Sequence, residues 1–463
     1  MIKSNYSLYF ILFLFYLFFP SCSTESPTNE LVIAIVWPKI QKDSFHKGVE
    51  LAIKHLKEES SIIKDNNIRF VNIDEGHEES IEANYEHTKN MVNNIINIPG
   101  IFAVIGHASN RLSEFSSLSY DKHGITFINI GATASFTSSH GFDYYYRALP
   151  NDRVIAKTIV ESLINAGYRK PIIIWEPIES THISLEITHH YAKKGIDLKG
   201  NFNFYPVDLK RDYSKRDHSL DKAFMKISST ISAMDKDAYD SIIILGHSPP
   251  IAYLVNHLRK LGITKIIAGN HRFDSDGFLK LIEQAESKNN PPANNLNPLL
   301  SSIETYHDFS RLDQATKISL AESYKSNLNS SSPLIFTTFI NKTWLPIANG
   351  FFFPEPEGFP IFDKFVEEFY SEYSDYPDTW SSAVYKSIKL LMHGIMETNS
   401  VTPAVVNAYL EFHNESIGVT GSNNYNFKGE LKNPEIFINI YVNGNLKRLI
   451  IPKLETELYD IDN

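Results

Sequence analysis

Short β-branched runs alternate with longer segments of helical period from Leu31 onward. The run LVIAIVW at residues 31–37 is typical of a buried strand, and in the DSFHKGVELAIKHLKEE that follows, the apolar residues fall on one helical face. The runs NIRFVNID, IFAVIGH and ITFINI continue the pattern, with helices expected near residues 79–96 and 109–122. Strands that alternate with helices favour βαβ units around parallel sheets, so the sequence predicts an α/β fold.

A second series of the same kind begins after RALPND. A helix that Gly167 closes leads to PIIIWE, a helix near residues 181–194, a strand in GNFNFYP and a helix near residues 220–234. SIIILGH, PPIAYLVNHLRKLG and KIIAGN complete the series. Two successive open α/β units therefore fill residues 31–270, and about 440 residues after the N-terminal segment are enough for two domains.

The pattern changes at residues 287–346. NNPPANNLNP and SNLNSSSP are loop-like, with a helix expected between them at residues 314–325, and we interpret residues 287–346 as an insertion. Two helices separated by a turn at residues 376–378 follow, and the last part of the chain alternates turns with strands. These strands are expected to form closing hairpins.

The only cysteine of the 463 residues, Cys22, follows an apolar run at residues 8–19. That run of about 12 residues is too short to span a bilayer and has the proportions of a signal peptide. Ser21-Cys22-Ser23 resembles the lipobox of bacterial lipoproteins, which implies a signal peptide over residues 1–21, lipidation of Cys22 and a polar tether over residues 22–30. The alternative is an ordinary secreted protein with an incidental cysteine. A single cysteine permits no intramolecular disulfide, so stability must come from the core.

The charge pattern excludes several functions. The net charge is −10 and there is no basic stripe, which argues against a nucleic acid partner. The sequence contains no G-x-S-x-G, H-E-x-x-H, Walker loop or G-x-G-x-x-G after a strand, so no enzyme activity and no cofactor are expected. His182, His189 and His190 have helical spacing that could meet a metal, but a partly solvated helix face is the expected reading, and no metal site is predicted.

Four segments occur in an order that resembles a known family. They are IFAVIGHASN, DKHGITFINIGATASF, YYYRALPNDRVIAKTIVESL and GVTGSNNYNFKGELKNPEIFINIYVNG. The family is that of type I periplasmic binding proteins, the branch that includes leucine/isoleucine/valine-binding proteins and the ligand-binding regions of related receptors. The resemblance implies two Rossmann-like open parallel-sheet lobes that close on a ligand. Lobe 1 would comprise residues 31–149 and 347–417, and lobe 2 would comprise residues 150–346 and 418–463.

Small and polar residues follow two strands of the first unit. In open α/β sheets ligands bind beyond the carboxyl ends of strands, where amide donors are exposed, and an anionic head such as a carboxylate suits such a nest. In amino-acid-binding relatives the matching positions hold the α-carboxylate, and by resemblance they fall at Ser109 or Asn110 and at Gly131, Ala132 and Thr133. Capping of helices uses the same residue types, so Ser109 and Thr133 could be merely helix caps, and both readings can hold at once.

The second unit supplies the other candidates. The family's tyrosine position falls on His247, and its acidic partner for the ligand ammonium falls near Asn270, where an amide cannot supply the charge. Glu176 or Asp274 could replace that acid; otherwise each is a solvated loop carboxylate. Trp37 could stack on a ligand or pack in the core.

The sequence therefore predicts a lipid-anchored, extracytoplasmic solute-binding protein of the bacterial cell envelope. It would bind a small polar ligand, an amino acid or related compound, and present it to an ABC permease, with its membrane contact through Cys22. The membrane face could be that of the inner or outer membrane, or the cell surface. The alternative is an envelope lipoprotein that keeps the fold as a sensor or structural regulator of a protein partner.

Overall fold

The computed structural model describes residues 30–282, 334–338 and 360–449, apart from gaps at 40–43, 60, 66, 77–80, 136–139, 178, 205–217, 249, 275–277, 279–280, 376, 413–416, 419–420, 423–424, 433, 435 and 443–444. Cys22, the tether, the predicted helix at residues 314–325 and the predicted crossing at residues 346–347 lie outside this part of the chain. Within it, no helix is long and apolar enough to span a membrane.

The first sheet has five strands, all parallel, in the order β2-β1-β3-β4-β5. Its strands are β1 (Leu31–Trp37), β2 (Ile68–Asp74), β3 (Ile101–Gly106), β4 (Thr126–Asn129) and β5 (Tyr145–Arg147). Residues 32–36 of β1 are at most 1% exposed, which is expected for a central parallel strand with both faces covered.

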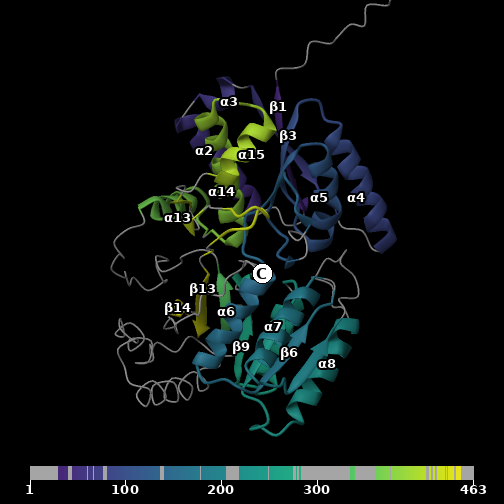
Figure 1. Ribbon diagram of the computed structural model, residues 1–463. Coiled ribbons are helices and arrows are strands. Elements are labelled where there is room, and N and C mark those ends of the chain that lie inside the picture. The colour runs from purple at the N-terminus through teal and green to yellow at the C-terminus, as the bar shows by residue number, and fades with distance from the viewer. Residues whose placement is uncertain are drawn as a thin grey trace, which may run out of the picture.

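Helices cover both faces of this sheet (Figure 1). They are α2 (Ser44–Glu59), α3 (Ile62–Asp65), α4 (Ile81–Ile96), α5 (Asn110–Lys122), α13 (Pro360–Tyr373), α14 (Thr379–Thr398) and α15 (Pro403–Phe412). The late helix α14 packs along the early helix α2, where a methyl group on Gly48 would overlap the backbone of Ser381. The chain therefore returns to the first sheet after β10 of the second sheet and before β13 and β14, which complete it.

The second sheet has seven strands in the order β14-β13-β10-β9-β8-β6-β7. They are β6 (Pro171–Trp175), β7 (Gly200–Asn203), β8 (Ser241–Leu245), β9 (Ile266–Gly269), β10 (Leu334–Thr338), β13 (Phe437–Val442) and β14 (Asn445–Leu449). The strands from β7 to β10 run parallel. β13 and β14 form the expected closing hairpin, in which β13 is antiparallel both to β14 and to its other neighbour, β10.

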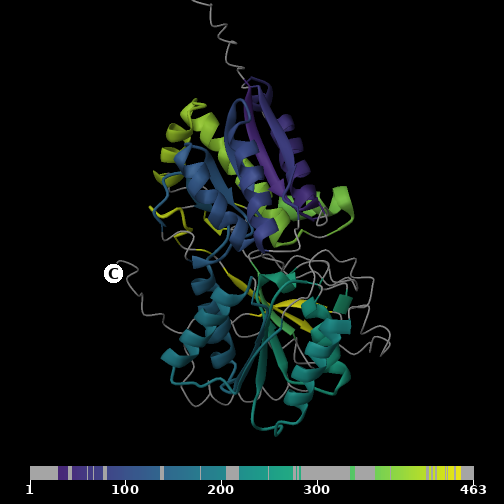
Figure 2. The same ribbon diagram turned by 90° about the vertical axis from the view of Figure 1, so that its right-hand side faces the viewer.

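The second sheet is also flanked by helices, and Figure 2 shows it below the first as a separate body. These elements are α6 (Asp152–Asn165), α7 (Thr181–Lys193), α8 (His218–Ser232), α9 (Pro250–Lys260) and the 3₁₀ helix η3 (His271–Asp274). A short two-stranded ribbon, β11 (Ile417–Gly418) with β12 (Gly421–Ser422), completes the described elements. Two α/β bodies with parallel sheets confirm the predicted fold class.

One prediction is wrong at β10. We assigned residues 287–346 to an insertion, but Leu334–Thr338 forms a strand in the interior of the second sheet, between β9 and β13. Leu334 and Ile335 are buried in the core. The run LIFTT has the β-branched and aromatic residues that strands favour, and the loop-like SNLNSSSP before it concealed that signal.

The segment around Gly429 covers the free edge of β5. Arg147 N donates to the Gly429 carbonyl at 2.8 Å, and Gly429 has a φ of +68°. A side chain there would overlap the Tyr145 carbonyl. The predicted lobe boundary at residue 418 puts this segment in lobe 2, whereas these contacts are with the first sheet. The lobe boundaries as a whole stay a prediction.

Replacing Gly48 by alanine should lower the free energy of unfolding by about 1–3 kcal/mol, because the added methyl group forces α2 and α14 apart. Urea denaturation measures the loss. Lys57→Ala on the exposed face of the same helix is the control and should change stability by less than about 0.5 kcal/mol. Equal stability of the two variants would contradict the close approach of these helices.

Candidate functional site

Buried polar residues gather where strands of the two sheets end. From the first sheet come Glu75 after β2, the β3–α5 loop and the residues after β4; from the second come Glu176 and Glu179 after β6, His247 after β8 and the residues after β9. All the predicted ligand-binding residues lie in the described part of the chain. Most are less than 9% exposed, and His247 is half-buried.

The β3–α5 loop is held by a buried histidine that sequence reasoning passed over. His107 Nδ1 lies 3.0 Å from Glu75 Oε1, and its Nε2 lies 3.2 Å from the Tyr120 hydroxyl. Ala108 N donates to Glu75 Oε2 at 2.8 Å. Because His107 and Glu75 are at most 1% exposed, these contacts fix the loop that leads into α5.

Ser109 is the N-cap of α5, since its hydroxyl accepts a hydrogen bond from Leu112 N at 3.1 Å. Ser109 is therefore a helix cap, and its contact with a ligand stays a prediction. Asn110 begins the helix, and its side-chain oxygen accepts from Thr133 N and from Ala134 N, both at 2.9 Å. Two amide donors of the predicted nest are thus occupied by the protein's own amide group.

Two further amides of the nest are also bonded within the protein. Ala132 N donates to Asn129 Oδ1 at 2.9 Å, and Gly131 N donates to the His107 carbonyl at 2.9 Å. A side chain on Gly131 would overlap the Ala108 backbone, so glycine lets the loops after β3 and β4 approach closely. The structure brings Ser109, Asn110, Gly131, Ala132 and Thr133 together, as predicted.

A carboxylate from the second body lies at the start of α5. Asn110 N donates to Glu179 Oε2 at 3.0 Å, and Asn110 Nδ2 donates to the Glu179 carbonyl at 3.2 Å. Burial raises the pKa of Glu179, against the opposing effects of the His247 and Arg272 charges and of the Asn110 amide. Glu179 was not predicted, although it follows the same strand as Glu176 and could have been found by the same reasoning about strand ends.

Glu176 and His247 form a close pair. His247 Nδ1 lies 2.5 Å from Glu176 Oε2, and His247 N donates to the same oxygen at 3.2 Å. The pKa of Glu176 lies below its ordinary value: burial alone would raise it, but the charge and hydrogen bonds of His247 and the charge of Arg272 outweigh burial. At 1% exposure, Glu176 is not a solvated loop carboxylate, and that alternative is wrong.

Asp274 joins the second body to the first. The Thr379 hydroxyl, at the start of α14, donates to Asp274 Oδ2 at 2.9 Å. Asp274 is 1% exposed, so the solvated alternative is wrong for it as well. Asn270 is also buried, and its side-chain oxygen accepts from Arg272 N at 3.1 Å, which shapes the turn into η3.

Trp37 packs in the core. Its ring stacks on Phe45 with centroids 4.0 Å apart and an interplanar angle of 4°, and Trp380 lies 5.6 Å away. The same Trp380 meets His271 edge-on at 5.3 Å. Trp37 is 2% exposed, so the packing alternative is the one observed, and it supports the contact between α14 and η3.

Asp152, at the first position of α6, is a second carboxylate that sequence reasoning missed. It is 1% exposed, and neither of its carboxylate oxygens makes a well-formed hydrogen bond to a described residue. Burial raises the pKa of Asp152 to about 6, although the Thr133 hydroxyl and the charges of Arg147 and Arg272 oppose this. The aspartate is visible in RALPND at the start of the predicted helix. However, acidic residues are common in the first turn of a helix, where they stabilise the helix dipole, so its position alone did not indicate a site.

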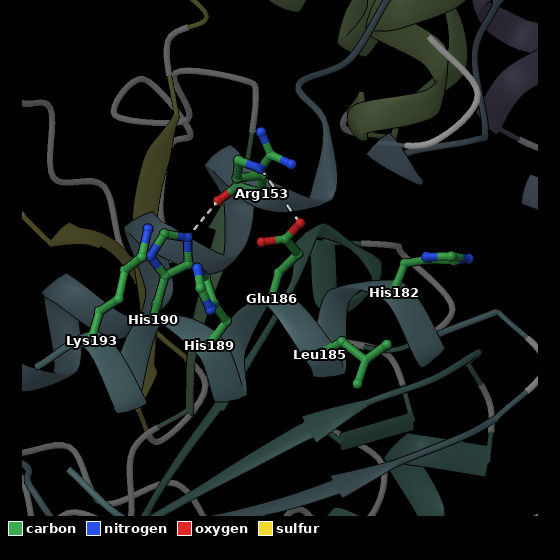
Figure 3. Close-up of a pocket in the computed structure, with 7 residues that line it drawn as sticks. All are labelled: Arg153, His182, Leu185, Glu186, His189, His190 and Lys193. Atoms are coloured by element: carbon green, nitrogen blue, oxygen red, sulfur yellow. Dashed lines mark hydrogen bonds and ion pairs between the residues drawn. The ribbon is translucent and has the colours of Figure 1, made fainter. Parts of the chain in front are cut away.

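A separate hollow of about 420 Å³ runs along the outer surface of α7 (Figure 3). It is lined by residues of α6 and α7: Arg153, His182, Leu185, Glu186, His189, His190 and Lys193. His190 Nε2 lies 3.3 Å from the Arg153 carbonyl. Among the described residues no group of three or more potential ligands could hold a metal ion.

Replacing Asp152 by asparagine should stabilise the protein at pH 7 by on the order of 2–3 kcal/mol. The carboxyl group has a pKa of about 6 when folded against 3.8 ordinarily. Between these values the folded chain holds more protons, so the Asp152 contribution to stability falls as the pH rises. The gain should therefore shrink toward zero near pH 4.

Chemical denaturation at pH 4, 5, 6 and 7 measures this difference. Asp197→Asn, at an exposed position, is the matched control and should show no such trend. A variant at Asp152 that is less stable than the unchanged protein at pH 7 would contradict the assignment.

The chain is similar in sequence to a known family of ligand-binding regions. Residues 46–433 match the family model for the receptor family ligand binding region. Comparison with curated protein sequences finds no match.

Solved structures share the architecture. An ABC transporter substrate-binding protein from Desulfitobacterium hafniense, in complex with leucine, has 17% identity and a TM-score of 0.63 over 91% of this chain and 100% of its own. A leucine-binding protein from Thermotoga maritima has 15% identity and a TM-score of 0.64 over 90% and 97%.

A branched-chain amino acid transporter substrate-binding protein from Streptococcus pneumoniae, in complex with isoleucine, has 14% identity and a TM-score of 0.63 over 90% and 98%. These similarities establish a common fold. Together with the family match over most of the sequence, they confirm that the chain belongs to the receptor family of ligand-binding regions and has the type I periplasmic-binding-protein fold.

Proposed function

We propose that this protein is an extracytoplasmic solute-binding protein that captures a small polar ligand between its two bodies for ABC-type import. The observation that carries the proposal is the set of polar contacts that cross from one body to the other at the strand ends. Asn110 contacts Glu179, and Thr379 contacts Asp274. Ligands of open α/β sheets bind at this edge.

The mechanism is closure of the two bodies on the ligand. A ligand shifts an equilibrium between open and closed forms only by the contacts that differ between them. Asn110, Thr133, Glu176, His247 and Asp274 come from both bodies, so a ligand among them would gain contacts on closing. Family membership supports this reading, and so do the solved relatives, two of which are described as transporter substrate-binding proteins in complex with leucine or isoleucine.

Lipidation of Cys22 belongs to the same proposal. The apolar run, the small residues around the cysteine and the polar tether are the features that support it. The anchor would keep the protein beside its permease at the cell envelope. The alternative function, regulation of a protein partner, is not favoured by any contact within the described ranges.

Native mass spectrometry of the chain that starts at Ser23 tests the capture of a solute. We expect a co-purified mass of a small molecule that disappears after mild unfolding and refolding, and that returns when cell extract of low molecular weight is added. A chain that carries no small mass and ignores the extract would contradict solute binding.

Replacing Cys22 by alanine tests the anchor. The variant should move from the membrane fraction to the soluble extracytoplasmic fraction, because a covalently attached lipid is the proposed source of membrane affinity. Ser23→Ala is the matched control and should stay with the membrane. Continued sedimentation of the Cys22 variant with membranes would rule out lipidation as the anchor.

A further inference from the structure

The position that suits a ligand carboxylate is filled by the protein itself. The amide donors at the start of α5 and after β4 are the groups that could hold an anion there. Asn110 N is bonded to the Glu179 carboxylate, and Thr133 N and Ala134 N are bonded to the Asn110 side chain. A ligand with a free carboxylate would have to displace Glu179 before it could use the helix start.

The surrounding charges are mostly negative. Besides Glu75, which is bonded to His107 and Ala108, four buried carboxylates lie at the two edges: Asp152, Glu176, Glu179 and Asp274. The nearby guanidinium groups are Arg272, whose Nη2 lies 3.8 Å from Glu179 Oε2, and Arg147, whose two Nη atoms bond the Ala132 and Ala134 carbonyls. These four carboxylates outnumber the two guanidinium groups even when the charge of His247, which contacts Glu176, is added, and this favours a cation as the missing component.

Asp152 is the acceptor best suited to that cation. It is 99% buried, and both its carboxylate oxygens lack a well-formed hydrogen bond to the described residues. Its helix start adjoins the β4 loop, because Asp152 N donates to the Thr133 carbonyl at 2.7 Å. One oxygen of Glu176, Oε1, is likewise buried without a hydrogen-bond partner in the described chain. An ammonium or guanidinium group supplies the N–H donors that such oxygens accept.

Resting on the proposed function, we propose that the ligand is a small organic cation without a free carboxylate, such as an amine or a guanidine. Asp152 holds its cationic group, Glu176 is the second acceptor, and Glu179 excludes ligands that carry an α-carboxylate.

Isothermal titration calorimetry of the full chain in detergent, stripped of ligand by refolding, tests this with three matched pairs. They are leucine with 3-methylbutylamine, lysine with 1,5-diaminopentane, and arginine with agmatine. In each pair the amine is the amino acid without its carboxylate. In at least one pair the amine should bind at least about tenfold more tightly than the amino acid, because the amino acid must displace Glu179 from the helix start. A tenfold difference in Kd corresponds to about 1.4 kcal/mol.

Two variants locate the effect. Asp152→Asn should weaken binding of the preferred amine by about tenfold or more, and Glu179→Ala should shift the preference toward the amino acid by a similar factor. Glu186→Gln, on the outer face of α7, is the control and should leave both affinities unchanged. Thermal unfolding of each variant checks that it is folded, and Asp152→Glu should rescue part of the amine affinity.

The outcomes separate the inference from the function on which it rests. Tighter binding of the amino acid in every pair that binds overturns the inference but leaves solute capture intact. If none of the six probes binds, the inference is also overturned. The small molecule that refolding removes from the protein then tests solute capture, and a neutral or anionic molecule would still support it. A chain with neither probe binding nor a stripped mass contradicts both.

Discussion

The contact between Glu179 and the start of α5 is the constraint on which the arrangement of the two bodies depends. The first amides of a helix have no partner within the helix, and a buried helix start must find one elsewhere. Here the partner is a carboxylate from the other sheet, at 3.0 Å from Asn110 N. A second pair, Thr379 with Asp274, also joins the two bodies.

Opening the two bodies would exchange these contacts for water. His107 and Glu75 keep the β3–α5 loop fixed within the first body, so the helix start would keep its direction as the bodies separate. Asp152 has the opposite energetics: its carboxylate is buried without a well-formed hydrogen bond to a described residue, and water would solvate it on opening. Without a ligand, the burial of Asp152 therefore opposes closure, and the contacts of Glu179 and Asp274 favour it. A ligand can shift the balance between these effects.

The fold followed from local patterns, and the site followed only in part. LVIAIVW and SIIIL predicted strands because fully buried parallel strands are continuous apolar runs, whereas LIFTT was hidden by the loop-like residues before it. Small residues after β3 and β4 correctly indicated a cluster at the strand ends. Local patterns could not predict which backbone amides at the strand ends are already hydrogen-bonded. The Asn110 side chain and Glu179 reach these amides only through tertiary packing.

The most direct test of closure is a distance measurement between spin labels on the two bodies. Cysteines at Lys122 on the first body and Lys194 on the second, both exposed, can be labelled in the chain that starts at Ser23, which has no other thiol. Double electron–electron resonance should give two distances for the stripped protein, and the co-purified ligand should shift the population to the shorter one. A single distance that no small molecule alters would contradict capture by closure.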